Sequence, residues 1–287
     1  MLSLKNFKND VNLQDYCTIH VGGKAKYLYE AQSISELLKA CELCKLHNIM
    51  YKIIGLGANL IFNDLGFNGA IIVNRANKII TRKNHLYIDS GTPISKIINH
   101  CYLHGLSGLE NLAGIPSTLG GAIVNNLGAN ACEIGNFIDY VLCINNNGKI
   151  IKINKNKCNF SYRNSAFKTN NFIILKAKLT LNYDEKEQIK QRIIANINKK
   201  INSQPMNLPS AGSVFKRGVI IPSLEIDKLG IKGTKIGGAM VSTKHAGFIV
   251  NTGNATSKNV LDLINLIKEK VKSCLGAELE LEVEFVD

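Results

Sequence analysis

The chain has 287 residues, of which 45% are hydrophobic and 20% charged, a composition typical of a globular protein of two domains rather than a disordered one. Its apolar runs fall far short of the ~20 residues that span a bilayer, and its start carries no signal-peptide pattern, so we expect no membrane partner and a cytoplasmic location. The net charge of +13 comes from lysines spread along the whole chain without interleaved aromatic residues, which argues against a nucleic-acid partner.

The eight cysteines are scattered and lack the dense spacing of a disulfide scaffold. One pair, Cys41-x-x-Cys44, has a spacing that can bind zinc or carry out redox chemistry. It lies inside a helical pattern, however, and no second pair lies near it in the sequence. We therefore expect these two cysteines to pack in the interior, and we expect no metal site.

In the first part of the chain, strand and helix patterns alternate. A strand over residues 27–30 precedes a helix that Ser33 caps, with Glu36 three residues later. A second strand over 51–54 runs directly into the glycine turn Gly55-Leu56-Gly57-Ala58-Asn59-Leu60. This turn follows the second strand, whereas the dinucleotide-binding fingerprint of a Rossmann domain follows the first strand and opens a helix. We interpret the turn as one wall of a ligand site.

The next elements lead to the most glycine-rich stretch of the chain. Short strands over 70–73, 78–81 and 85–90 precede a helix over 93–104. The stretch from 105 to 130 then holds six glycines, and its part from Gly114 to Ala122 predicts a tight turn that opens a short helix. Backbone N–H groups at such a turn can bind a pyrophosphate. On glycine content alone, a structural loop between helices remains an equal alternative.

The rest of the chain predicts a hairpin, a linking helix and a second domain. Strands over 140–144 and 149–153 flank a turn, and a long strand covers 172–181. A charged helix over 184–202 links a first domain of residues 1–185, divided near residue 75 into two subdomains, to a second domain of residues 200–287. The second domain predicts a strand over 248–251, a helix over 257–274 and a last strand over 278–286 with its glutamates facing outward.

With these elements placed, the chain resembles the UDP-N-acetylenolpyruvoylglucosamine reductase family along nearly its whole length. The blocks that carry the resemblance, in order, are VGGKA (21–25), GLGANL (55–60), the stretch 108–128, YRxSxF (162–167), GSVF (212–215) and LELEV (279–283). The resemblance implies an α+β fold: an FAD-binding domain of the vanillyl-alcohol-oxidase type (PCMH-type), followed by a smaller α+β substrate-binding domain. The short spacing between Arg163 and Ser213 is similar to the branch that lacks an inserted tyrosine-bearing loop. We expect a monomer.

The resemblance also implies the reaction. It is the reduction of UDP-N-acetylenolpyruvoylglucosamine to UDP-N-acetylmuramate, a step of peptidoglycan precursor synthesis, with FAD as cofactor and NADPH as reductant. Ser213 is assigned as the proton donor, and Arg163 and Glu282 as the residues that polarise the substrate carboxylate. A guanidinium suits this task because its fork matches a carboxylate. A serine is a poor acid in water, so its role requires a closed site.

Two further groups of residues follow from the matching blocks. The residues assigned to FAD are Gly55, Leu56, Gly57, Ala58, Asn59, Leu60, Gly114, Ile115, Pro116, Ser117, Thr118, Gly120, Gly121, Ala122, Asn126, Gly128 and Ala129. In the second domain, Lys216, Arg217 and His245 suit the diphosphate or uridine of a UDP-sugar substrate.

The sequence departs from the family at three positions. Ser117 stands where the family usually has glycine, Leu127 where alanine is common, and Ala58 where serine is frequent. The backbone N–H donors survive all three changes, so we expect FAD binding to persist.

Other hypotheses remain open on the residues alone. By pattern, Arg163 would be a solvated arginine, Ser213 a turn residue and Glu282 part of a solvated strand face. A different oxidoreductase on the same flavin domain, or a catalytically silent flavin-binding module, are the alternatives. A dispensable Ser213 or Glu282 would favour the first of them.

Overall fold

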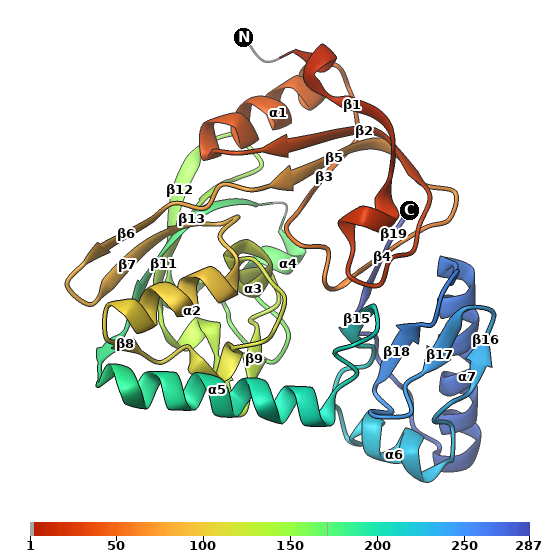
Figure 1. Cartoon of the computed structure of the whole chain (residues 1–287). Helices are drawn as coiled ribbons and strands as arrows, with labels where there is room; N and C mark the ends of the chain where they lie inside the picture. The colour runs from red at the N-terminus through yellow and green to blue at the C-terminus, as the bar shows by residue number, and fades with distance from the viewer. Residues whose placement is uncertain (1–2, 171) are drawn as a thin grey trace.

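The computed structural model describes residues 3–170 and 172–287. Two sheets and their helices form a larger α+β part, and a smaller α+β part at the C-terminal end lies beside it (Figure 1). Among these described residues, every helix is too short or too polar to span a bilayer.

The first sheet has the strand order β1-β2-β5-β3. Its strands are β1 (Lys8–Asn12), β2 (Lys24–Ala31), β5 (Phe67–Asn74) and β3 (Tyr51–Ile54). Strands β2 and β3 both run parallel to β5, because helix α1 (Ile34–Leu46) carries the chain back between them. The Ser33 hydroxyl caps α1 by accepting the Glu36 N–H at 3.2 Å, as predicted. Cys41 and Cys44 are buried free thiols in α1, and burial raises the pKa of each, to about 12 and about 11.

The second sheet is antiparallel throughout, with the order β12-β11-β13-β7-β6. Its strands are β6 (Ile79–Arg82), β7 (His85–Asp89), β11 (Ile138–Ile144), β12 (Ile150–Asn154) and β13 (Ile173–Thr180). The predicted hairpin is therefore present, formed by β11 and β12. Helices α2 (Ile94–Leu103) and α3 (Leu119–Val124) contribute apolar side chains to the core on this sheet. The Asn74 side chain at the end of β5 donates to Ser90 Oγ at 2.8 Å, which ties the two sheets together.

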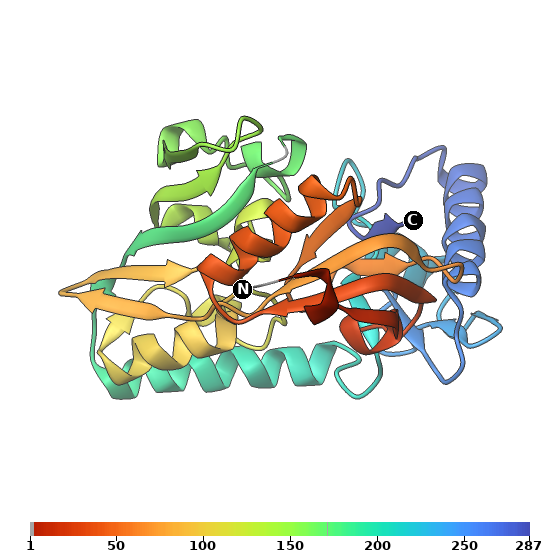
Figure 2. The ribbon, with the colours of Figure 1, turned by 90° about the horizontal axis from the view of Figure 1, so that it is seen from above.

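Helix α5 (Lys186–Ser203) supports the glycine-rich segment from below and then leads into the C-terminal part (Figures 1 and 2). Arg192 on α5 donates to Glu110 and Asp184, and Asn196 donates to Asn111 Oδ1 at 3.2 Å. Both Glu110 and Asn111 belong to the short helical turn at residues 110–112 inside that segment. The glycine-rich segment is thus held by side chains that lie about 80 residues later in the chain.

The C-terminal part is an antiparallel sheet covered on its outer side by helix α7 (Ser257–Leu275) (Figure 1). The sheet has the order β15-β18-β17-β16, with β15 (Ser210–Ser213), β18 (Phe248–Asn251), β17 (Ala239–Val241) and β16 (Lys235–Ile236). Helix α6 (Pro222–Lys228) lies between β15 and β16 in the chain. The buried stripe of α7, which includes Leu263 and Ile267, joins one apolar cluster with Leu28 and Ile71 of the first sheet. The hydrophobic core is therefore continuous between the first sheet and the C-terminal part.

Five short elements complete the fold around the glycine-rich segment and the cleft. Strand β8 (Leu106–Ser107) pairs with β14 (Asn182–Tyr183), and β9 (Gly128–Ala129) pairs with β10 (Cys132–Glu133). Helix α4 (Ala166–Thr169) follows the YRxSxF block. These elements close the larger part around the end of the second sheet.

The prediction of a continuous last strand over residues 278–286 is wrong. Only β19 (Glu284–Val286) is a strand, and it pairs in parallel with β4 (Leu60–Phe62) of the larger part. Just before it, the Glu282 N–H donates to Val214 O at 2.8 Å and the Glu284 N–H donates to Asn59 O at 2.9 Å. The segment crosses from one part to the other, so its backbone bonds are divided between them. For the same reason the Glu282 side chain does not face solvent and is only 17% exposed.

Candidate active site

A cleft of about 1960 Å³ lies between the two parts of the fold. It is lined by the β3–β4 turn, the glycine-rich segment, residues around Arg163, and segments of the C-terminal part around residues 210–217, 245–248 and 280–284. A pocket for one small ligand measures about 300–1,000 Å³, so this cleft has room for more than one ligand. The cleft has two walls, named for the ligands that the family resemblance implies: the cofactor wall (residues 55–60 and 114–129) and the substrate wall (residues 162–168, 210–217, 245–248 and 280–284).

The first loop of the cofactor wall is residues 55–60. Gly57 has φ +65°, and a Cβ there would lie 2.0 Å from the Tyr16 carbonyl oxygen, so only glycine fits. A Cβ at Gly55 would lie 2.3 Å from Thr118 Oγ1, which shows how closely this loop packs on the second one. The N–H groups of residues 56–59 donate to no acceptor on any described residue, so they remain available to a ligand.

The second loop of the cofactor wall leads into α3, as the sequence predicts. Thr118 caps this helix, but the Leu119 N–H donates to Thr92 O at 2.8 Å and the Gly120 N–H to Ser90 O at 2.7 Å. The first N–H groups of α3 are therefore hydrogen-bonded within the protein and are not available to a ligand. The N–H groups of Ser117 and Thr118, which have no acceptor among the described residues, are the available donors instead. The structural role predicted for the glycine-rich loop is present, and the N–H groups of Ser117 and Thr118 leave the predicted anion-binding role open to this loop.

The structure places two of the residues assigned to FAD outside the lining of the cleft. Ala122 is fully buried in α3, and Asn126 is fully buried behind the wall. The Asn126 amide donates to Glu133 Oε2 at 2.6 Å and to Ser161 O at 3.0 Å, while its Oδ1 accepts the Gly135 N–H. These bonds occupy the side chain, so Asn126 fixes the loop rather than facing a ligand. Every other residue of that assignment lines the cleft.

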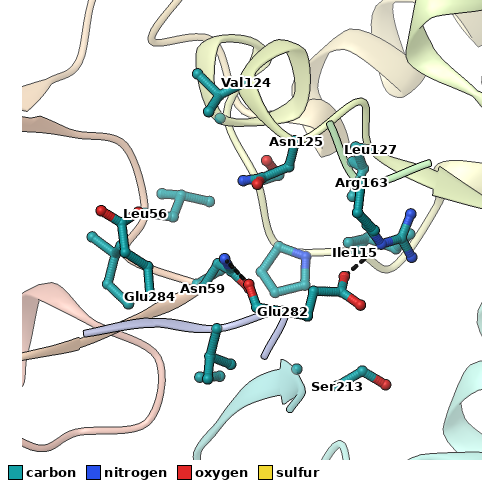
Figure 3. Close-up of a pocket in the computed structure, with 18 of the residues that line it drawn as sticks. Leu56, Asn59, Ile115, Val124, Asn125, Leu127, Arg163, Ser213, Glu282 and Glu284 are labelled. Carbon is teal, nitrogen blue, oxygen red and sulfur yellow. Dashed lines mark hydrogen bonds and ion pairs between the residues drawn. The ribbon is translucent and has the colours of Figure 1, made fainter. Parts of the chain in front are cut away.

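The cofactor wall fits FAD by the chemistry of its donors. Six N–H groups, from residues 56–59, 117 and 118, have no acceptor in the described part of the chain and suit the negative charge of a pyrophosphate. The apolar side chains of Leu56, Ile115 and Leu127 border the same space and suit a flat aromatic ring system (Figure 3). The replacements at Ala58 and Ser117 leave these backbone donors in place.

The substrate wall is built around an ion pair that joins distant parts of the chain. Arg163 Nε donates to Glu282 Oε1 at 2.5 Å, and both side chains are mostly buried, at 19% and 17% exposure (Figure 3). The Arg163 backbone has φ +52°, an uncommon conformation for a residue with a side chain. The Nη1 and Nη2 groups of Arg163 bond to no described residue. Glu282 thus fixes one edge of the guanidinium and leaves the other edge available to an anion.

Ser213 lies at the end of β15, on the same wall as Glu282 (Figure 3). The pairing of β15 with β18 is irregular between Ser210 and Ser213, and Gly212 has φ +79° with open space where a Cβ would stand. Among the described residues, none accepts a hydrogen bond from the Ser213 hydroxyl. The hydroxyl is therefore free to donate to a ligand.

Lys216, Arg217 and His245 also line the substrate wall. Lys216 is paired with the Glu280 carboxylate, and the Arg217 N–H donates to the Tyr162 hydroxyl at 3.1 Å. His245 Nδ1 accepts the Gly247 N–H at 3.1 Å, which leaves Nε2 to carry the proton of the neutral ring. Burial, together with the charges of Lys232 and Arg217, lowers the pKa of His245. The ring is therefore neutral near pH 7.

The sequence patterns did not predict that Lys168 and Lys200 line the cleft. Lys168 on α4 donates to Asn125 Oδ1 at 3.0 Å and to the Arg163 carbonyl oxygen at 3.4 Å, so it braces the backbone of the central arginine. Its sequence signal was its place one residue after the YRxSxF block. Lys200 on α5 lines the cleft beside Gly114 and is 7% exposed. The sequence did not indicate a role for Lys200, because Lys200 lies in the locally basic segment 196–200, which is typical of a solvated helix face.

The sequence and the fold both match known proteins along the whole chain. A family model described as FAD binding domain matches residues 25–154, and one described as UDP-N-acetylenolpyruvoylglucosamine reductase, C-terminal domain, matches residues 204–286. The UDP-N-acetylenolpyruvoylglucosamine reductase of Clostridium novyi (strain NT) is 37% identical, over 100% of this chain and 94% of that protein. The reductase of the same name from Thermotoga sp. (strain RQ2) is 40% identical, over 95% and 91%.

A solved structure agrees with these matches. The crystal structure of UDP-N-acetylenolpyruvylglucosamine reductase from Thermus caldophilus is similar with a TM-score of 0.84 at 30% identity, covering 98% of this chain and 100% of that one. The matches confirm the predicted α+β fold, an FAD-binding part followed by a smaller C-terminal part.

Proposed function

Because the chain belongs to the UDP-N-acetylenolpyruvoylglucosamine reductase family and is an FAD-binding oxidoreductase, we propose that it reduces UDP-N-acetylenolpyruvoylglucosamine to UDP-N-acetylmuramate with NADPH as the reductant. One observation carries the proposal. The Arg163 guanidinium is fixed by Glu282 through Nε, while its Nη1 and Nη2 bond to no described residue. It shares the cleft with the Ser213 hydroxyl, which has no acceptor among the described residues, and with a wall suited to FAD.

The reaction sets three requirements on the protein. A hydride is added to the terminal alkene carbon, negative charge develops on the adjacent carbon and its carboxylate, and a proton then completes the saturated product. Bound FAD, once reduced by NADPH, supplies the hydride. The residues of this chain must therefore orient the alkene, stabilise the developing charge and deliver the proton.

Arg163 is proposed to bind the substrate carboxylate through Nη1 and Nη2. Glu282 holds the opposite edge of the guanidinium, so the fork is oriented before the substrate arrives. As negative charge spreads onto the carboxylate, the interaction strengthens, and this lowers the barrier. Donors placed in this way contribute about 10²- to 10³-fold to the rate in other enzymes.

Ser213 is proposed to donate the proton. Its O–H bond breaks as the new C–H bond forms, and water then restores the hydroxyl proton. The transfer is favourable only to a strongly basic carbon, which is what the hydride addition creates. Lys216, Arg217 and neutral His245 are proposed to hold the UDP part, since they offer two cations and a ring N–H on the same wall.

The two half-reactions test the proposal separately. We expect Ser213→Ala to keep the reduction of bound FAD by NADPH and to slow its reoxidation by the enolpyruvyl substrate by about 10²- to 10⁴-fold. In D₂O the wild-type product should carry one solvent deuterium on the carbon next to the carboxylate. Ser273→Ala, at an exposed position of α7 outside the cleft, serves as the control and should change neither step.

Two results would contradict the assignment. An equal loss of both half-reactions in Ser213→Ala would indicate structural damage rather than loss of a proton donor. Normal reoxidation in that variant would assign the proton to another group.

A further inference from the structure

Lys200 is a buried cation that pairs with no carboxylate of the described residues. Its side chain lies on α5 and lines the cleft, and the residue is 7% exposed. The ammonium donates to the Asn111 carbonyl oxygen at 3.1 Å, and among the described residues no acidic group lies within ion-pair distance. Burial, and in second place the charge of Lys199, lowers the pKa of Lys200.

Such an arrangement is unfavourable for the protein alone. A buried charge without a counter-charge destabilises the folded state, and natural chains keep such groups paired. Arg192 on the same helix shows the usual solution, because it binds the carboxylates of Glu110 and Asp184. The Asn111 carbonyl and the C-terminal end of α5 compensate Lys200 only in part. A negative charge from outside the chain would complete the compensation.

The surroundings of Lys200 indicate which ligand supplies that charge. A Cβ at Gly114 would lie 3.4 Å from Lys200 Cδ, so the lysine stem packs against the first residue of the second loop of the cofactor wall. Ser117 and Thr118, three and four residues further along that loop, present N–H groups that have no acceptor among the described residues. Lys200, Ser117 and Thr118 all line the same cleft.

We propose that Lys200 is an FAD-binding residue whose ammonium neutralises the pyrophosphate of the cofactor, in concert with the backbone donors of the cofactor wall. The proposal rests on the FAD site proposed above. This role accounts for a lysine at a buried position of α5. It also implies that the buried charge is less favourable in the flavin-free protein than in the protein with FAD bound.

The test compares two neutral replacements with a matched control on the same helix. Lys200→Met fills the space without charge, and Lys200→Gln also keeps a donor for Asn111. Lys190→Met removes the same charge from an exposed position that is paired only with Glu187. Thermal unfolding of the deflavinated proteins and titrations with FAD and with riboflavin, which lacks phosphate, give the readouts.

We expect both Lys200 variants to bind FAD about 10- to 100-fold more weakly than the wild type, the range of a lost charge-assisted hydrogen bond. Their affinity for riboflavin should be unchanged. Deflavinated Lys200→Met should melt at least about 2 °C higher than the deflavinated wild type, because the buried charge is gone. Lys190→Met should match the wild type in all three measurements.

Three results would overturn the proposal. They are unchanged FAD affinity in both Lys200 variants, an equal loss for FAD and riboflavin, and a loss of FAD affinity in Lys190→Met as large as in the Lys200 variants. A wild-type protein that takes up no FAD would instead refute the proposed function itself, so the two failures are distinguishable.

Discussion

The two walls of the cleft are built on opposite principles. The cofactor wall offers a ligand mainly the backbone N–H groups of residues 56–59, 117 and 118, which come from two continuous loops and have no acceptor among the described residues. The substrate wall uses charged and polar side chains, among them Arg163, Ser213 and Glu282, which come from three separate segments. The donors of the cofactor wall are positioned by backbone conformation, whereas the function of the substrate wall depends on the identity of its side chains.

This difference determines how each wall responds to mutation. On the substrate wall, removal of one side chain should abolish a chemical role while the fold persists. On the cofactor wall, a change of side chain should matter little unless the added atoms collide with the backbone that forms the loop. The predictions below test this contrast.

The largest effect is expected on the substrate wall. Arg163→Met should lower the rate of substrate-dependent FAD reoxidation by about 10²- to 10³-fold, because the developing charge on the carboxylate loses its partner. Arg163→Lys should recover only part of the loss, since it restores the charge without the fork. Rapid mixing of the pre-reduced enzyme with substrate measures this rate. Arg82→Met, which removes an arginine outside the cleft, is the control, and equal losses in both variants would refute a specific role.

On the cofactor wall, Gly57→Ala should destabilise the protein and its FAD site by more than the matched variant Gly276→Ala. Both glycines have φ +65°, so both variants carry the left-handed strain of about 1–2 kcal/mol. At Gly276 a Cβ meets nothing within 4 Å, whereas at Gly57 it would lie 2.0 Å from the Tyr16 carbonyl oxygen. Chemical denaturation and FAD titration measure the difference. Equal effects at the two positions would mean that the tight contact is irrelevant.

A smaller, pH-dependent effect is expected below the cofactor wall. Burial alone would raise the pKa of Glu110, but donors including its own N–H, the Gly108 N–H, Arg192 and Ser107 outweigh it, so the pKa lies below its ordinary value of 4.5. The charged form is thus favoured by folding, and this stabilisation is complete above pH 4.5 and is lost as the pH falls through the lower folded-state pKa.

Glu110→Gln should accordingly cost about 2 kcal/mol of unfolding free energy at pH 7, the scale of a charge-assisted hydrogen bond. The difference from the wild type should shrink as the pH falls below 4.5. Urea denaturation across this pH range measures it. A difference that is constant with pH would show that the charge of Glu110 is not what stabilises the segment.

The smallest effects should come from the side chains at which the cofactor wall departs from its family. Ala58→Ser and Ser117→Gly should each change the FAD dissociation constant by less than about 3-fold, because the backbone donors are the same in every variant. FAD titration of the deflavinated proteins measures this. A larger change would mean that side chains at these positions contact the cofactor and that the contrast between the walls is overstated.

The sequence predicts the cofactor wall better than the substrate wall for a physical reason. Turns and caps are local, so the glycines at 55 and 57 and the Thr118 cap leave signals within a few residues. The ion pair of Arg163 with Glu282 joins residues 119 positions apart, and the alternating pattern around Glu282 predicted a solvated strand. Only the resemblance to a family pointed to these residues.

Asn126 and Lys200 were also misjudged because their contacts are with residues far away in the chain or not evident from the local sequence. Asn126 lies in a matching block, yet its amide is occupied by protein groups that the local sequence does not reveal. Lys200 looked solvated, because nothing near it in the chain shows that α5 packs against Gly114. Periodicity did suffice for α7 and for the hairpin of β11 and β12, since one buried face or one turn defines each of them.

The use of one cleft by both FAD and the UDP-sugar is tested most directly by an anaerobic absorbance titration of the purified protein. We predict a flavin spectrum that bleaches when NADPH is added and returns when stoichiometric UDP-N-acetylenolpyruvoylglucosamine follows. Bleaching without recovery would leave the FAD site in place and contradict the proposed substrate. A protein that takes up no FAD, and shows no flavin spectrum, would contradict the cofactor wall itself.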